Sequence, residues 1–184
     1  MQPGTGGAGG VRAPDAGQLR ALFALMEAGS LLQHQIEQHL QAEGGISWVQ
    51  FQLLTRLADA DGPLTMTQLA DGVVYSRSGL TYQAGLLEKA GLITREPSAE
   101  DDRVTVVTIT RKGLDLVGRL LPGHIQVTRR LLFDPLSDQD VRRLGDIMTR
   151  VRDHMREQPP RSAAPRSAAR RSAASRGRRS GAPG

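Results

Sequence analysis

Apolar residues recur at the three- and four-residue spacing of one helix face in the first long stretch of the chain. The pattern runs from Gln18 to about Ala42 and stops at Gly44-Gly45, where glycine favours a helix end. Ser47 is followed three residues later by Gln50, the arrangement of a capping box. The sequence therefore predicts one long helix and, directly after it, a second helix that begins near Ser47.

Two shorter helices are predicted next. Thr65 and Gln68 form another capping box, and the helix that they begin stops near Gly72. Ser76 is the expected cap of the following helix, which ends at Ala90-Gly91. Short helices joined by a tight turn that contains glycine are typical of a helix-turn-helix. The second helix carries its apolar residues on one face: Leu80, Ala84 and Leu87.

Two short strands and two long helices complete the predicted body. Leu92–Glu96 and Val104–Ile109 are rich in β-branched residues, and the polar turn between them makes them a hairpin. Thr110 is expected to cap a long helix that Pro122-Gly123 kinks or breaks in two. The last helix begins at Ser137, and its apolar residues alternate by three and four, as at a helix–helix seam: Val141, Leu144, Met148, Val151 and Met155.

A helix-turn-helix followed by a β-hairpin is a winged helix, and long helices precede and follow it here. In this order and spacing the chain resembles the MarR family of bacterial transcriptional regulators over about Leu19–Met155. The stretches that carry the resemblance are SWVQFQLLTRL (47–57), SRSGLTYQAGLLEKAGLI (76–93) and EDDRVTVVTIT (100–110). The last of them fits the family's wing pattern through Asp101, Arg103, Val107, Ile109 and Thr110.

The expected fold is mainly α with a small β-hairpin wing. A winged helix at about 47–110 lies within a domain of 18–158. Helices at about 18–42 and 111–157 flank it, and because both are amphipathic and lie on either side of one small domain, they favour a homodimer. The apolar seam of the last helix could instead belong to the core of a single chain. A dimer would place two recognition helices about one DNA turn apart, on a pseudo-palindromic site in double-stranded DNA.

The residues expected to contact DNA lie mainly on the second helix of the turn motif and on the wing. A helix that enters the major groove needs small polar residues at its N-terminus, so that its N–H groups approach phosphates and bases. Arg77 is the leading candidate for base readout or a phosphate contact, and an ordinary solvent-facing arginine is the alternative. The full set is Thr65, Thr67, Ser76, Arg77, Ser78, Thr81, Tyr82, Asp101 and Arg103.

The wing pair has a more specific expectation. The resemblance implies that Arg103 enters the minor groove, whose negative potential attracts a guanidinium. Asp101 would orient Arg103 by a bidentate ion pair. The alternative is a surface pair that never meets DNA.

Aromatic and histidine residues suggest a site for an effector. The resemblance implies small phenolic or aromatic effectors, bound between the dimer helices and the winged helix. The candidate residues for such a site are His34, Trp48 and Phe51, with His39 nearby in the sequence. Ordinary core packing of the same residues is the alternative.

Charge is distributed unevenly along the chain. Residues 159–184 repeat an Arg-Ser-Ala-Ala motif and hold seven arginines and no acid, whereas residues 18–157 hold 16 basic and 18 acidic groups, a net of −2. The overall charge of +5 therefore belongs to the tail. We expect this Arg-rich tail and the glycine-rich residues 1–17 to be disordered, since neither has an apolar face to bury.

Several classes of protein are disfavoured. The chain has no cysteine, which removes disulfides, thiolate metal sites and cysteine nucleophiles. No apolar run approaches a membrane span, and the N-terminus lacks the pattern of a signal peptide, so a bacterial cytoplasmic, nucleoid-associated location is expected. His124 and His154 lack metal-ligand spacing, and no catalytic motif is present. We expect no enzyme activity, metal or cofactor.

The predicted function is sequence-specific regulation of transcription, as a repressor of its own or neighbouring genes that a small molecule releases. One rival is a nucleoid-associated architectural protein that binds DNA through the Arg-rich tail. Another is a ligand- or protein-binding dimer whose winged helix does not bind DNA.

Overall fold

The computed structural model describes residues 13–70, 77–98, 101 and 103–157. The side chain of Arg77 is outside the described part, as are Gly72, Ser76, most of the segment 1–17 and the Arg-rich tail 159–184. The chain divides into two compact units, Met1–Pro135 and Leu136–Gly184.

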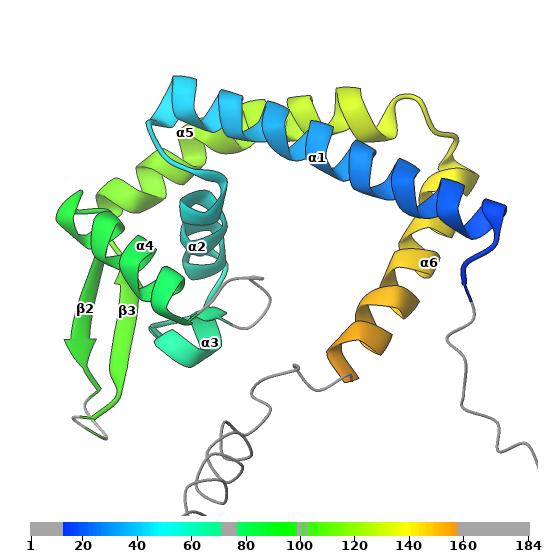
Figure 1. Cartoon of the computed structure of the whole chain (residues 1–184). Coiled ribbons are helices and arrows are strands. Elements are labelled where there is room, and N and C mark those ends of the chain that lie inside the picture. Colours follow the sequence, from blue (N-terminus) through cyan, green and yellow to red (C-terminus); the bar gives the residue numbers. More distant parts are fainter. Residues whose placement is uncertain (1–12, 71–76, 99–100, 102, 158–184) are drawn as a thin grey trace, which may run out of the picture. The chain divides into compact units, whose positions relative to one another are not determined.

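The first unit is mainly helical with a small antiparallel sheet (Figure 1), which confirms the predicted fold class. In chain order its elements are α1 (Ala16–Gly44), α2 (Trp48–Ala58), β1 (Leu64–Thr65), α3 (Met66–Ala70), α4 (Arg77–Lys89), β2 (Ile93–Pro97), β3 (Thr105–Ile109), α5 (Arg111–Thr128) and the π-helical turn η1 (Arg129–Phe133).

Helix α1 begins at Ala16, so the expectation that all of residues 1–17 are disordered is wrong at its C-terminal end. The reason is local. Asp15 and Gln18 form a reciprocal capping box, in which each side chain accepts a hydrogen bond of 2.9 Å from the backbone N–H of the other residue. The aspartate therefore satisfies N–H groups that would otherwise be open at the helix start.

The predicted capping boxes of α2 and α3 are confirmed. Ser47 Oγ accepts from the Gln50 backbone N–H at 3.2 Å, while Gln50 Oε1 accepts from the Ser47 backbone N–H at 2.9 Å. Thr65 and Gln68 make the same exchange at 3.1 and 2.8 Å. These short-range signals set the starts of the two helices that precede the recognition helix.

The sheet has one strand more than predicted. β2 and β3 form the expected hairpin, with Ile93 opposite Ile109 and Pro97 opposite Thr105. The short β1 pairs with the other edge of β3, so that the strand order is β1-β3-β2. Two residues are too few to show a period-two pattern, and the pairing partner of β1 lies about 40 residues away in the chain, so sequence reasoning missed this strand.

One apolar core joins the winged helix to α1 and α5. Helix α4 contributes the face that was predicted from its spacing, with Leu80, Ala84 and Leu87 each at most 2% exposed. The remaining buried residues come from α1, α2, α3, α5, the strands and the segments between them: Ile36, Leu40, Ile46, Phe51, Leu53, Leu54, Leu57, Leu69, Leu92, Ile93, Val107, Leu116, Val117 and Leu120.

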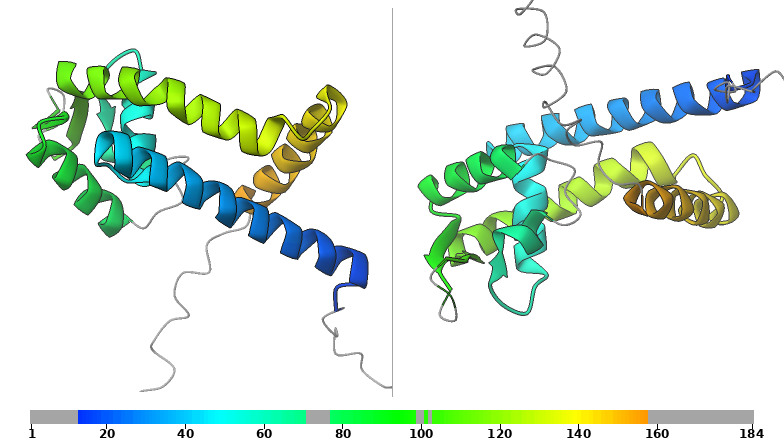
Figure 2. Two further views of the ribbon diagram at one scale, coloured as in Figure 1. Left: turned by 90° about the horizontal axis from the view of Figure 1, so that it is seen from above. Right: turned by 60° about the horizontal axis from the view of Figure 1, so that its bottom comes forward.

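Helices α1 and α5 run side by side (Figures 1 and 2) and are antiparallel, with Gly44 against Leu120 and His39 against Gly123. Of the two outcomes expected at Pro122-Gly123, a kink or a break, the break is wrong, because α5 continues to Thr128. Proline removes the hydrogen bond to the carbonyl four residues earlier, that of Gly118. Both Pro122 and Gly118 are exposed, so water can satisfy this carbonyl.

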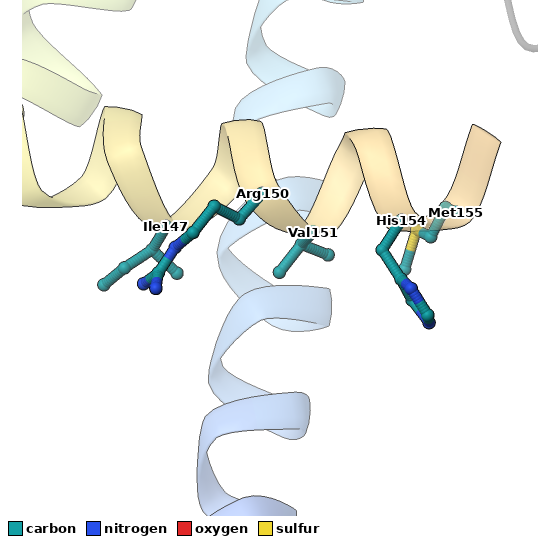
Figure 3. Close-up of a pocket in the computed structure, with 5 residues that line it drawn as sticks. All are labelled: Ile147, Arg150, Val151, His154 and Met155. Atoms are coloured by element: carbon teal, nitrogen blue, oxygen red, sulfur yellow. The ribbon is translucent and has the colours of Figure 1, made fainter. Parts of the chain in front are cut away.

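The second unit contains α6 (Asp138–Glu157). It starts where predicted, with Ser137 Oγ accepting from the Asp140 backbone N–H at 3.2 Å. Ile147, Val151 and Met155 lie along one side of α6, flanked by Arg150 and His154 (Figure 3), and line a shallow hollow on this single helix. The three apolar side chains are 36–66% exposed, so within the described part of this unit they have no apolar cover.

Candidate nucleic-acid interface and aromatic cluster

Helix α4 has one buried face and one polar exposed face. Because Leu80, Ala84 and Leu87 point into the core, the intervening Ser78, Thr81 and Tyr82 face outward, with Tyr82 65% exposed. A large aromatic side chain at this exposure has a polar hydroxyl and an apolar ring available to a partner. The arrangement gives α4 the shape of a recognition helix, with a short-chain polar N-terminal half.

The structure describes only some of the other residues that were predicted to contact DNA from the helix-turn-helix. Arg77 is the first residue of α4, but its side chain lies outside the described part, as does all of Ser76. Thr67 is exposed on α3, while Thr65 is half-buried and its hydroxyl is engaged with Gln68. The structure thus brings Thr67 to the surface and gives Thr65 a capping role.

The wing carries Arg103 beyond the end of β2, on an exposed turn. The expected bidentate pair with Asp101 is not what the structure has. Asp101 Oδ1 accepts from the backbone N–H of Arg103 at 2.9 Å, and the Asp101 carbonyl accepts from the Val104 N–H at 2.9 Å. Asp101 therefore shapes the turn through the backbone, as aspartate side chains commonly do. Among the described ion pairs none involves the guanidinium of Arg103, which leaves it available to a phosphate or base.

Three aromatic rings meet where α2 packs against α5. Trp48 and Phe51 stack with ring centroids 6.1 Å apart, and the imidazole of His124 lies 5.3 Å from Trp48 and 5.1 Å from Phe51. Burial, followed by the nearby His39, lowers the pKa of His124. Its Nδ1 and the hydroxyl of Thr128, one turn later, are buried without a hydrogen-bond partner in the described structure.

Helix α1 reaches this aromatic cluster through a carboxylate. Glu37 Oε2 accepts from the Trp48 backbone N–H at 2.6 Å, and Gln41 donates to the other oxygen of Glu37 at 3.2 Å. His39 lies with Nε2 3.5 Å from the Leu120 carbonyl. His34, in contrast, is exposed, and no described contact connects it with Trp48 or Phe51.

The sequence placed Trp48 and Phe51 in one candidate site but did not predict that His124 and Glu37 contact it. A signal for His124 was present, since it follows Leu120 by four residues and Val117 by seven and so falls on the buried face of α5. No such signal exists for Glu37, because its acceptor role depends on how α2 packs beside α1.

Other kinds of site receive no support within the described ranges. No group of three His, Asp or Glu side chains there is close enough together to hold a metal ion. None of the described helices is both long and apolar enough to cross a membrane.

The order of α2, α3, α4 and the β2–β3 hairpin defines a winged helix-turn-helix protein. The sequence pattern of the MarR family matches residues 44–104. The chain is 31% identical to the MarR family transcriptional regulator Sco3205 of Streptomyces coelicolor, solved in complex with DNA. The match covers 83% of this chain and 94% of that one, with a TM-score of 0.77. The chain therefore belongs to the MarR family and is a DNA-binding transcriptional regulator.

Two further relatives agree with this assignment. AbsC, a MarR family regulator also from Streptomyces coelicolor, is 28% identical, and the match covers 80% of this chain and all of that one, with a TM-score of 0.76. The transcriptional regulator MhqR of Bacillus subtilis is 26% identical over 133 residues, which are 72% of this chain and 90% of that protein. Both matches extend beyond the winged helix into the flanking helices.

Proposed function

We propose that this protein represses its own or neighbouring genes by binding a pseudo-palindromic operator as a homodimer, and that a small aromatic or phenolic molecule releases it. The observation that carries the DNA part is the division of α4 into a buried apolar face and an exposed face with Ser78, Thr81 and Tyr82. In this proposal α4 lies in the major groove and Arg103 reaches the adjacent minor groove.

Exposed apolar side chains support the homodimer. The first half of α1 exposes large apolar residues that contact no core, among them Phe23 at 63% and Met26 at 61%. Helix α5 adds Leu121 and Ile125, and α6 independently carries its own apolar stripe. Exposed apolar surface of this extent is costly in water and is typical of protein–protein contacts. A second copy of the chain would cover the same faces on both subunits.

The aromatic cluster supports the effector. Trp48, Phe51 and His124 join α2 to α5, and Glu37 joins α1 to the same place, so a ligand there would touch both the dimer helices and the winged helix. BpsR of Bordetella bronchiseptica, whose DNA binding is regulated by 6-hydroxynicotinic acid, shares the fold at 18% identity and a TM-score of 0.68. A ligand that binds one spacing of the two recognition helices better than another would shift the DNA-binding equilibrium.

Footprinting on the promoters of its own gene and the divergent neighbour tests the proposal. We expect a protected pseudo-palindrome with half-sites about 10 bp apart from centre to centre, as two recognition helices on one face of the duplex require. Arg103→Ala should lower operator affinity roughly tenfold, the order of magnitude of one interaction with a groove. Arg119→Ala, on an exposed position of α5, is the matched control and should bind as the wild type does. Equal protection of random DNA would refute the proposal.

A further inference from the structure

Glu88 and Arg95 form an ion pair between the recognition helix and the wing. Arg95 Nε and Nη2 both donate to Glu88 Oε2, at 2.9 and 2.5 Å, and the two side chains are 28% (Arg95) and 37% (Glu88) exposed. The hydrogen bond from Arg95 lowers the pKa of Glu88. The other four described ion pairs join residues at most five apart in the chain. This pair alone among them links two separate elements.

The turn between α4 and β2 is fixed independently of this pair. Gly91 has φ of +70°, and the N–H groups of Gly91 and Leu92 donate to the carbonyls of Glu88 and Leu87, which closes α4 with a Schellman motif. Lys112 Nζ donates to the Ala90 carbonyl at 2.7 Å, and Thr110 Oγ1 donates to the Gly91 carbonyl at 2.8 Å. These bonds fix the base of the wing, at the start of β2 and the end of β3, and none of them reaches the wing tip.

The ion pair acts further along the wing. Arg95 is the central residue of β2 and lies opposite Val107 of β3, between the turn and the tip that carries Arg103. The other end of the pair is in the last turn of α4, and a Cβ at Gly85, one turn earlier, would lie 4.0 Å from Arg95 Nη2. The guanidinium therefore lies along the side of α4, where it resists rotation of the wing away from the helix.

We propose that Glu88 and Arg95 are positioning residues that fix the angle of the wing to the recognition helix, so that Arg103 meets the minor groove when α4 lies in the major groove. The inference rests on the proposed function. Groups that must act together need to be held to within about half an ångström of their working geometry. A partly exposed ion pair adds little to stability, so its effect on the wing angle is separable from its effect on folding.

The test is a double-mutant cycle with the full chain on its operator. Glu88→Gln keeps the shape of the side chain and removes its charge, and it should lower operator affinity roughly threefold to tenfold, with thermal unfolding close to that of the wild type. In an Arg103→Ala background the same change should have no further effect, because the arginine that the pair positions is then absent. The charge-reversed pair, Glu88→Arg with Arg95→Glu, should recover most of the affinity.

Asp115→Asn is the matched control, since it removes the ion pair of Arg111 and Asp115 within α5 and should leave affinity unchanged. Glu88→Gln binding equal to that of the wild type overturns the inference. An equal reduction in both backgrounds also overturns it, because it would indicate a general structural defect. If Glu88→Gln does not fold, Arg95→Gln in the same cycle decides the question. Failure of the wild type to prefer the operator would instead refute the proposed function.

Discussion

His124 of α5 contacts residues of α1 and α2, so its protonation state bears on how these three helices pack. Its ring packs on Trp48 and Phe51, it lies near His39 of α1, and its buried Nδ1 lacks a partner within the described structure. An imidazole in such a place is held neutral, because protonation would bury a charge that no acceptor compensates. We therefore expect the stability of the folded chain to depend on pH through this residue.

The sign of this dependence follows from the lowered pKa of His124. The unfolded chain binds a proton as pH falls through about 6.5, whereas the folded protein does not until lower pH, so folding is progressively destabilised below that value. His124→Phe should weaken this acid sensitivity. Urea unfolding at pH 8 and pH 5.5, followed by the fluorescence of Trp48, measures it. At pH 8 the histidine is neutral in both the folded and the unfolded chain, so the difference in unfolding free energy between the two proteins there reports only the change in packing. An identical fall in stability for both proteins would contradict the prediction.

Contacts between elements decide which substitutions the helices tolerate. Gly113 and Gly118 are about one and a half turns apart on α5 but have opposite surroundings. A Cβ at Gly113 would overlap the Leu92 carbonyl oxygen and lie 2.7 Å from Cγ1 of Ile109, whereas a Cβ at Gly118 meets nothing within 4 Å. Close approach of the wing to α5 therefore requires glycine at the first position only.

Alanine at these two positions is expected to change the free energy of unfolding in opposite directions. Gly113→Ala should destabilise the protein by about 1–3 kcal/mol, because the backbone of α5 must move away from the Leu92 carbonyl at the start of the wing. Gly118→Ala should stabilise it by about 0.5–1 kcal/mol, since alanine loses less backbone entropy in a helix. Chemical denaturation of both variants beside the wild type provides the measurement. Stabilisation by both substitutions would show that the wing does not press on α5 as described.

The start of each element was predictable where the signal is local. Ser47, Thr65 and Ser137 begin helices because a side chain three residues away completes the cap, and the sequence contains all of that information. The face of α4 was predictable for the same reason, because helical spacing alone places Leu80 in the core.

Features that depend on distant parts of the chain were not predictable. The β1–β3 pairing joins Leu64 to Val107, and the contact of Glu37 with Trp48 needs the packing of α1 on α2. Asp101 was mispredicted for a different, local reason, since its partner two residues away is the backbone of Arg103 and not its guanidinium. Residue types suggested a pair there, but the turn geometry selected which atoms meet.

In the whole molecule, the excess of positive charge and the winged helix lie in different parts of the chain. Residues 18–157 carry a net charge of −2, while seven arginines lie in the tail 159–184. Non-specific attraction to DNA grows with the number of cationic contacts, whereas sequence preference requires groups held against base edges. We therefore expect the tail to supply part of the affinity and the winged helix to supply the specificity, since the ion pair and the turn hold the wing against α4.

The sharpest test of this division compares the full chain with a chain that lacks 159–184, on operator and on scrambled DNA over a range of salt concentrations. We predict that deletion weakens binding to both DNAs and lowers the salt dependence, by up to about 0.9 in slope for each phosphate that the tail neutralises. The ratio of operator to scrambled affinity should stay the same. A ratio that falls to one after deletion would contradict this division, because specificity would then belong to the tail.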